Sequence, residues 1–157
     1  MAASYGLGEY QIQRMKANMT EMEEFYRMYV EMEILCDQIR LPYRQVLQVL
    51  QKDRPKYLKN ILNDALQQME LYTDEGMESI WEKAICRELS NKTNHLELYK
   101  QIANSFGMED AKGSVGRYYL WKLENLIKET QKEQKGKYKL YRATAMFLGI
   151  TIITFFL

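Results

Sequence analysis

The chain has 157 residues, and its 22 Lys and Arg nearly balance its 21 Asp and Glu, giving a formal net charge of +1. This length suits one domain, and a near-neutral balance provides no overall field for nucleic acid, so we expect no nucleic-acid partner. Only two prolines and eight glycines interrupt the chain. Together with the lack of alternating β-branched stretches before the C-terminal tail, this predicts an all-α fold.

The first predicted helix is long and covers residues 9–40. Its apolar side chains recur at spacings of three and four, which places them on one face. Such a stripe most often packs in a core, and the alternative is a groove that binds a partner helix. The two rows of this face are Met15, Met19, Met22, Tyr26 and Tyr29, and then Met28, Met32, Leu35 and Ile39.

Four shorter amphipathic helices are predicted between Pro42 and Gly107, separated by polar turns. Pro42 ends the first helix and can open the second. We expect Trp81 to be a core residue of the fourth helix. The four apolar faces are Val46, Leu47 and Leu50; Leu58, Ile61, Leu62, Ala65, Leu66 and Met69; Ile80, Trp81, Ala84, Ile85 and Leu89; and Leu96, Tyr99, Ile102 and Ala103.

A turn after Phe106 is predicted to separate the fifth helix from the sixth. Gly107 suits the left-handed conformation that stops a helix, and Asp110 suits the N-cap of the next one. Capping explains both residues, and a partner-binding carboxylate at Asp110 is the alternative. The sixth helix should bury Tyr119, and a solvated helical stalk should follow over residues 128–137.

The last stretch, residues 143–157, has no charged side chain and is mostly large and apolar. It spans about 22 Å as a helix, and snorkelling of the preceding basic side chains extends this toward the bilayer core of about 30 Å. The alternative is a buried core helix, but the only polar groups here are threonine hydroxyls, which can bond to their own backbone. Aromatic and basic residues are enriched where a membrane segment meets the membrane–water interface. Those before the run are Lys132, Lys135, Lys137, Tyr138, Lys139, Tyr141 and Arg142.

The sequence therefore predicts an antiparallel helical bundle of about six helices with a C-terminal transmembrane helix. Residues 9–137 would form a cytoplasmic domain, because Lys and Arg beside a membrane segment favour that side. Residues 138–157 would be the anchor, with membrane lipid as a partner. The main domain would then lie in the cytoplasm at the cell membrane.

No set of residues suggests catalysis. His95, the single histidine, has no serine or cysteine motif beside it, and no glycine-rich loop carries the lysine that holds a phosphate. Cys36 and Cys86 lack metal-ligand spacing and fit the role of small buried hydrophobic residues. We therefore expect no enzyme, no cofactor and no metal site.

The order of several motifs carries a family resemblance. Trp81 is followed by Ala84, Phe106-Gly107 is followed by Asp110, and Gly136-Lys137-Tyr138 leads after a long helix into an apolar segment containing Gly149. In this order the chain resembles the stage III sporulation protein AB family of endospore-forming Firmicutes. That family is similar to the helical cytoplasmic domain of the platform protein of type II secretion and type IV pilus systems.

The resemblance implies a structural, non-enzymatic role in a sporulation channel between mother cell and forespore. The protein would sit in the mother-cell membrane facing the forespore, among other subunits of the complex and near a secretion-type ATPase. The family has an N-terminal transmembrane helix, so residues 1–8 would be the stub of one. A stand-alone tail-anchored adaptor that binds a partner helix through the Met and Tyr stripe is the alternative.

Overall fold

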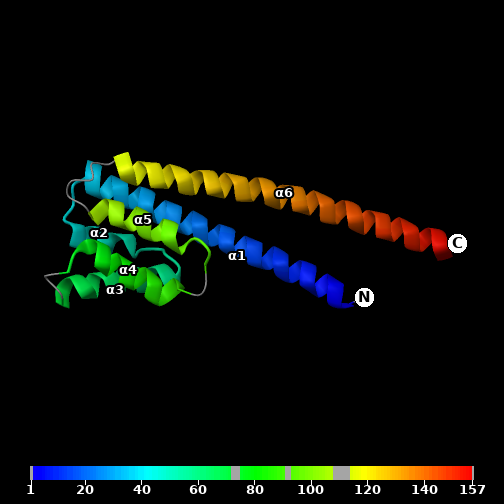
Figure 1. The fold of residues 1–157 in the computed structure, drawn as a ribbon, viewed down its shortest axis with the longest axis horizontal. Helices are drawn as coiled ribbons and strands as arrows, with labels where there is room; N and C mark the ends of the chain where they lie inside the picture. The colour runs from blue at the N-terminus through cyan, green and yellow to red at the C-terminus, as the bar shows by residue number, and fades with distance from the viewer. Residues whose placement is uncertain (1, 72–74, 91–92, 108–113, 157) are drawn as a thin grey trace. The chain divides into compact units, whose positions relative to one another are not determined.

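The computed structural model describes the backbone of residues 2–71, 75–90, 93–107 and 114–156, and side chains within 10–71, 75–90, 93–106 and 115–140. Over these residues the fold is all-α, without strands, which confirms the predicted class (Figure 1). Six α-helices and one π-helix follow in this order: α1 (Ala2–Glu33), η1 (Ile34–Gln38), α2 (Tyr43–Leu50), α3 (Lys56–Leu71), α4 (Met77–Leu89), α5 (Leu96–Gly107) and α6 (Ser114–Phe156).

The chain divides into two compact units. The globular unit is Thr20–Glu124, and the terminal unit joins Met1–Met19 with Asn125–Leu157. Helices α1 and α6 each contribute residues to both units.

The core of the globular unit lies between consecutive helices. Helices α2, α3, α4 and α5 pack each against the next in chain order (Figure 1). The predicted apolar faces of α2 and α4 are buried in full. In α3 the prediction was partly wrong, because Leu66 and Met69 are half-buried whereas Gln68 is buried.

Aromatic side chains join α1 to α5 in this core. Phe25 stacks on Tyr99 with ring centroids 3.9 Å apart, and Tyr29 stacks on Phe106 at 6.3 Å. Three methionines from the two rows of the predicted α1 face are buried beside these rings, namely Met22, Met28 and Met32. The stripe is therefore core, as its more common interpretation held, and this part of it presents no groove to a partner helix.

Gly116 allows the first turn of α6 to approach α5 closely. A Cβ atom at this position would lie 3.0 Å from Ser105 Oγ and 3.6 Å from the ring of Phe106. Ser105 is itself buried and donates a hydrogen bond to the carbonyl oxygen of Ile102 over 2.6 Å. A larger residue here would press on the Ser105 hydroxyl, so the absence of a side chain at Gly116 eases this close approach.

The first helix ends earlier than predicted, in a π-turn. The N–H of Ile39 bonds to the carbonyl oxygen of Ile34, five residues back, at 3.1 Å. The wider turn rotates Ile39 off the buried face, so Ile39 is 56% exposed although its α-helical spacing from Leu35 predicted burial. Arg40 then takes a positive φ of 57°, the conformation that commonly follows a helix end.

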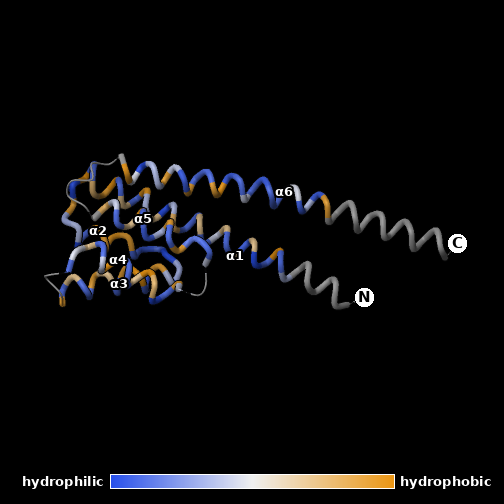
Figure 2. The backbone as a smooth tube through the Cα atoms, viewed as in Figure 1, coloured by the Kyte–Doolittle hydropathy of each residue, from blue (hydrophilic) through white to orange (hydrophobic). Residues whose placement is uncertain are grey.

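In the terminal unit, α1 begins at Ala2, so residues 2–8 continue the helix that was predicted from residue 9. Helix α6 runs on through the predicted stalk, which Figure 2 shows as a mostly hydrophilic stretch, and reaches Phe156. Among the residues whose side chains are described, no helix is apolar over a length sufficient to cross a membrane. The side chains of the predicted anchor from residue 141 onward lie outside the described residues.

Candidate functional site

Two buried tyrosines of the globular unit form hydrogen bonds between α1 and α5. Tyr29 Oη donates to the carbonyl oxygen of Tyr99 over 2.8 Å, and Tyr99 Oη donates to Glu21 Oε1 over 3.1 Å. Burial raises the pKa of Tyr29 well above its ordinary value. Burial and then the charge of Glu21 do the same for Tyr99. Both phenols therefore stay protonated and bridge α1 to α5 as structural groups.

Arg54 is a buried cation at the turn between α2 and α3. Its side chain is 4% exposed and forms an ion pair with Glu31, with Glu24 at 3.9 Å. Its Nε also donates to the carbonyl oxygen of Leu50 over 3.3 Å. A buried charge needs such partners, so these bonds tie the turn to α1.

Tyr57 and Cys36 are two further groups of this unit that keep their protons near neutral pH. Tyr57 Oη is buried and makes no hydrogen bond within the described part of the chain, and burial together with Glu21 and Glu24 raises its pKa. Burial and the neighbouring Asp37 raise the pKa of Cys36 to about 11, so its thiol is unreactive near neutral pH. Cys36 and Cys86 are half-buried and unpaired.

No cluster of three or more His, Cys, Asp or Glu that could hold a metal ion occurs over the described residues. His95 lies just before α5, and its backbone N–H bonds to Thr93 Oγ1 at 3.2 Å. Its ring packs edge-on near Tyr99.

Of the four residues predicted to matter for structure or partners, Trp81 has the clearest role. It is 0% exposed, and its Nε1 donates to Tyr43 Oη over 2.8 Å, which links α4 to α2. Tyr119 is half-buried and packs edge-on against Tyr118 at 5.4 Å, so it lies at the margin of the core instead of inside it. Gly107 is the last residue of α5, one later than predicted, and Asp110 lies outside the described residues.

An exposed aromatic face on the first turns of α6 is the strongest candidate for a contact surface. We define it as Val115, Tyr118 and Trp121, which are 44%, 56% and 58% exposed. The rings of Tyr118 and Trp121 lie 6.2 Å apart. Below them, Gly116 and Leu120 are buried, and Arg117 is fixed by a 2.8 Å ion pair with Glu33 of α1. The face therefore lies on the side of α6 opposite the residues that pack on the core.

The sequence prediction missed this face. Trp121 lies in a stretch where aromatic residues occupy several sides of the helix, so periodicity alone does not show which side is buried. Tryptophan and tyrosine are enriched at the centres of protein interfaces. The 58% exposure of Trp121 is seen only in the structure, and no local sequence signal gives it.

The fold and its surfaces define an all-α helical protein whose described features are structural bonds in the core and an exposed aromatic face on α6. The model of the family described as stage III sporulation protein AB matches residues 1–157, the whole chain, so the chain belongs to this family. This confirms the resemblance read from the motif order. No curated protein and no solved structure matches the chain significantly.

Proposed function

We propose that this protein is a non-enzymatic, membrane-anchored structural component of a secretion-like complex that forms a channel between mother cell and forespore. The observation that carries the proposal is the family match over the whole chain, which makes the protein sporulation-associated. The structure contributes a helical unit in which buried tyrosines and Arg54 tie α1 to the neighbouring elements. Such a unit suits a scaffold whose purpose is to present a surface.

The membrane part of the proposal rests on the C-terminal sequence. Residues 143–157 carry no charge, and the backbone of α6 is helical through Phe156. Cations immediately before an apolar segment favour a cytoplasmic position for the preceding domain. We assign the main domain to the cytoplasmic side of the mother-cell membrane that faces the forespore, near a secretion-type ATPase.

Membrane attachment is tested by fractionation of the full chain and of a chain truncated before Arg142. The full chain should stay with membranes in high salt, whereas the truncated chain should be released as a folded, helical protein. A reporter fused after Leu157 should be active only outside the cytoplasm. If the full chain is soluble without detergent and truncation unfolds it, the tail is a core helix and the anchor is wrong.

We assign the contact with other subunits of the complex to the exposed aromatic face of α6. Truncating an aromatic residue at the centre of an interface typically costs about 2 kcal/mol or more of binding, which is more than tenfold in affinity. Trp121→Ala should therefore reduce both co-purification of other sporulation proteins and the yield of heat-resistant spores in a host lacking its own copy. Because Trp121 is exposed, the thermal unfolding midpoint of the variant protein should hardly differ from that of the wild type.

Leu71→Ala is the matched control, since Leu71 is an exposed apolar side chain on α3, far along the chain from the face. It should leave spore yield and co-purification unchanged. Normal spore yield without the protein would overturn the proposed role. Normal yield with Trp121→Ala alone would overturn only the assigned face.

The alternative is a stand-alone adaptor that binds a partner helix. Its proposed binding stripe is buried in the globular unit at Met22, Met28 and Met32, so no observation favours it. Purification of the full chain with a single partner, and no other sporulation protein, would support it instead.

A further inference from the structure

The near-neutral charge of the chain conceals a division of charge between its two units. The terminal unit has eight Lys and Arg against three Asp and Glu, a net charge of +5. The globular unit has fourteen against eighteen, a net charge of −4. Positive charge is thus concentrated in the unit that contains both chain ends.

Within the terminal unit this charge is gathered by packing of α1 against α6. Gln134 Nε2 of α6 donates to the carbonyl oxygen of Met15 in α1 over 3.0 Å. Lys16 Nζ lies 5.7 Å from the centre of the Tyr138 ring, a cation–π distance. The two helices enclose a shallow groove of about 70 Å³, lined by these residues and by Lys137. This geometry brings basic residues from both helices to one place.

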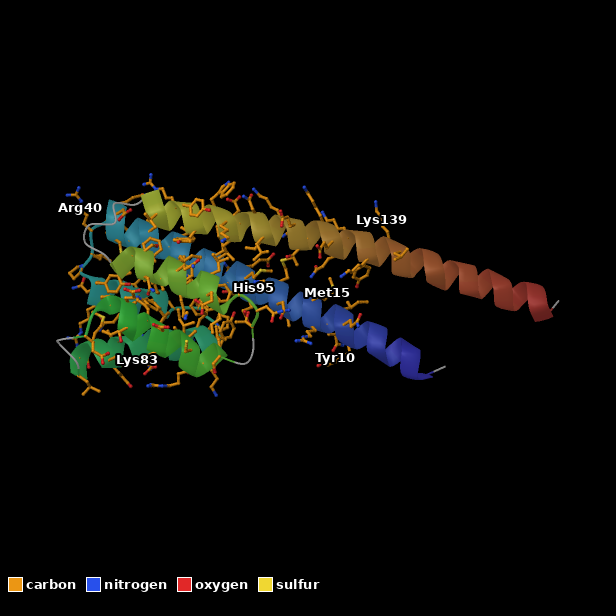
Figure 3. All side chains as sticks on the ribbon, in the orientation of Figure 1. Tyr10, Met15, Arg40, Lys83, His95 and Lys139 are labelled. Carbon is orange, nitrogen blue, oxygen red and sulfur yellow. The ribbon has the colours of Figure 1, made fainter. Side chains whose placement is uncertain are left out.

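We define the basic collar as Arg14, Lys16, Lys132, Lys135, Lys137 and Lys139, all exposed. Figure 3 shows Lys139 extending from α6 on the side away from α1. Exposed apolar side chains, Tyr10, Tyr138 and Leu140, accompany the collar. The members on α6 lie just before the uncharged tail in the sequence, which is the arrangement that a membrane interface favours.

In the described part of the chain, many cations of the globular unit are paired with carboxylates, whereas most cations of the collar are not. In the globular unit, Arg87 pairs with Asp64 at 2.5 Å and Lys83 with Glu75 at 2.5 Å. Lys100 has both Glu82 and Glu97 within 3.0 Å. Among the described residues, no carboxylate lies within 4.0 Å of the charged groups of Arg14, Lys132, Lys135, Lys137 or Lys139, and their charge remains available.

From this unneutralised charge we infer that the basic collar binds the headgroups of anionic phospholipids. The inference rests on the proposed membrane anchor and names the lipid class that it selects. An anionic membrane surface is the occupant because it offers many phosphates in one plane beside the apolar segment. Each Lys or Arg near such a surface strengthens binding about fivefold, so several together give strong selectivity.

The test is lipid selectivity of the full chain reconstituted in bilayers. Spin-labelled phosphatidylglycerol and phosphatidylcholine report, through the fraction of motionally restricted lipid, which headgroup the protein retains. The wild-type chain should prefer phosphatidylglycerol at least about fivefold at low salt. The preference should fall at 1 M salt, where charges are screened beyond about 3 Å.

The decisive variant replaces Lys132, Lys135, Lys137 and Lys139 with Gln, which keeps helix propensity and removes four charges. Its preference for phosphatidylglycerol should fall close to onefold. The matched control, Lys52→Gln with Lys56→Gln and Lys59→Gln, removes exposed charges of the globular unit and should retain the preference. Equal retention of both lipids by the wild-type chain, or an unchanged preference in the collar variant, overturns the inference.

Two further measurements distinguish lipid binding by the collar from a free-phosphate site and from the apolar anchor. Inorganic phosphate should reduce the preference no more than chloride at the same ionic strength, and a larger effect would show a free-phosphate site in place of lipid binding. Flotation with neutral vesicles reports the apolar anchor alone. A chain that floats only with anionic vesicles, and is released by salt, would overturn the anchor and support the collar.

Discussion

High pH should unfold this protein in one cooperative step, through tyrosines that the fold keeps protonated. Burial raises the pKa of Tyr29 and Tyr99, both 0% exposed, above the ordinary value of about 10. Near pH 10 the unfolded chain begins to lose these phenol protons, while the folded protein retains them. The stability that they contribute is therefore complete below about pH 10 and is lost as the pH rises.

The loss can be worked out for the two fully buried phenols. Each costs about 1.4 kcal/mol of stability at pH 11 and about 2.7 kcal/mol at pH 12. Together they remove about 3 and then about 5 kcal/mol, and the raised pKa values of Tyr43 and Tyr57 act in the same direction. Domains of this size have about 5–15 kcal/mol in total, so the midpoint should lie near pH 11–12.

Circular dichroism and tyrosinate absorbance, recorded on the same samples, are the measurements. Loss of helix and ionisation of the buried tyrosines should coincide. Tyr29→Phe should make stability fall less steeply above pH 10, by about 1.4 kcal/mol per pH unit. Tyr118→Phe changes an exposed tyrosine and is the control. Gradual ionisation of all tyrosines in a still helical protein would refute the reasoning.

Two substitutions in the globular unit should have different effects on the free energy of unfolding, measured by urea denaturation. Trp81→Ala empties a fully buried site and breaks the bond to Tyr43, so it should cost about 3–5 kcal/mol; a change within error would mean that Trp81 is not part of the core. Tyr57→Phe removes a buried hydroxyl that has no hydrogen-bond partner over the described residues, so it should be neutral or stabilise by about 1 kcal/mol. A clear loss there would show that the hydroxyl is bonded.

The fold class was predictable because helix periodicity is a local signal. Apolar residues spaced by three and four identified α2 and α4 with their buried faces, and Pro42 marked the start of α2 as its N-cap residue. The position of Trp81 in the core followed from the same pattern. These features depend on neighbours within a few residues of the chain.

Features that depend on distant partners were missed. Arg54 lies in one of the predicted polar turns, but its side chain is buried because its partner Glu31 comes from α1, 23 residues away in sequence. Trp121 was passed over for the opposite reason, since it is apolar but no helix of the globular unit covers it fully. In both cases tertiary packing, which leaves no local trace, decides whether the side chain meets water.

The π-turn at Ile34–Gln38 has a consequence for comparing this chain with other members of its family. A turn closed over five residues holds one residue more than an α-helical turn, and so has the form of a single-residue insertion. A relative lacking that residue would continue as a regular α-helix. An alignment with such a relative would need a one-residue gap at this turn. Only then would the residues after the turn be paired with residues in the same place in the fold. Deleting one residue here should thus be tolerated far better than deleting one near Phe25, where every following core side chain of α1 would leave its place.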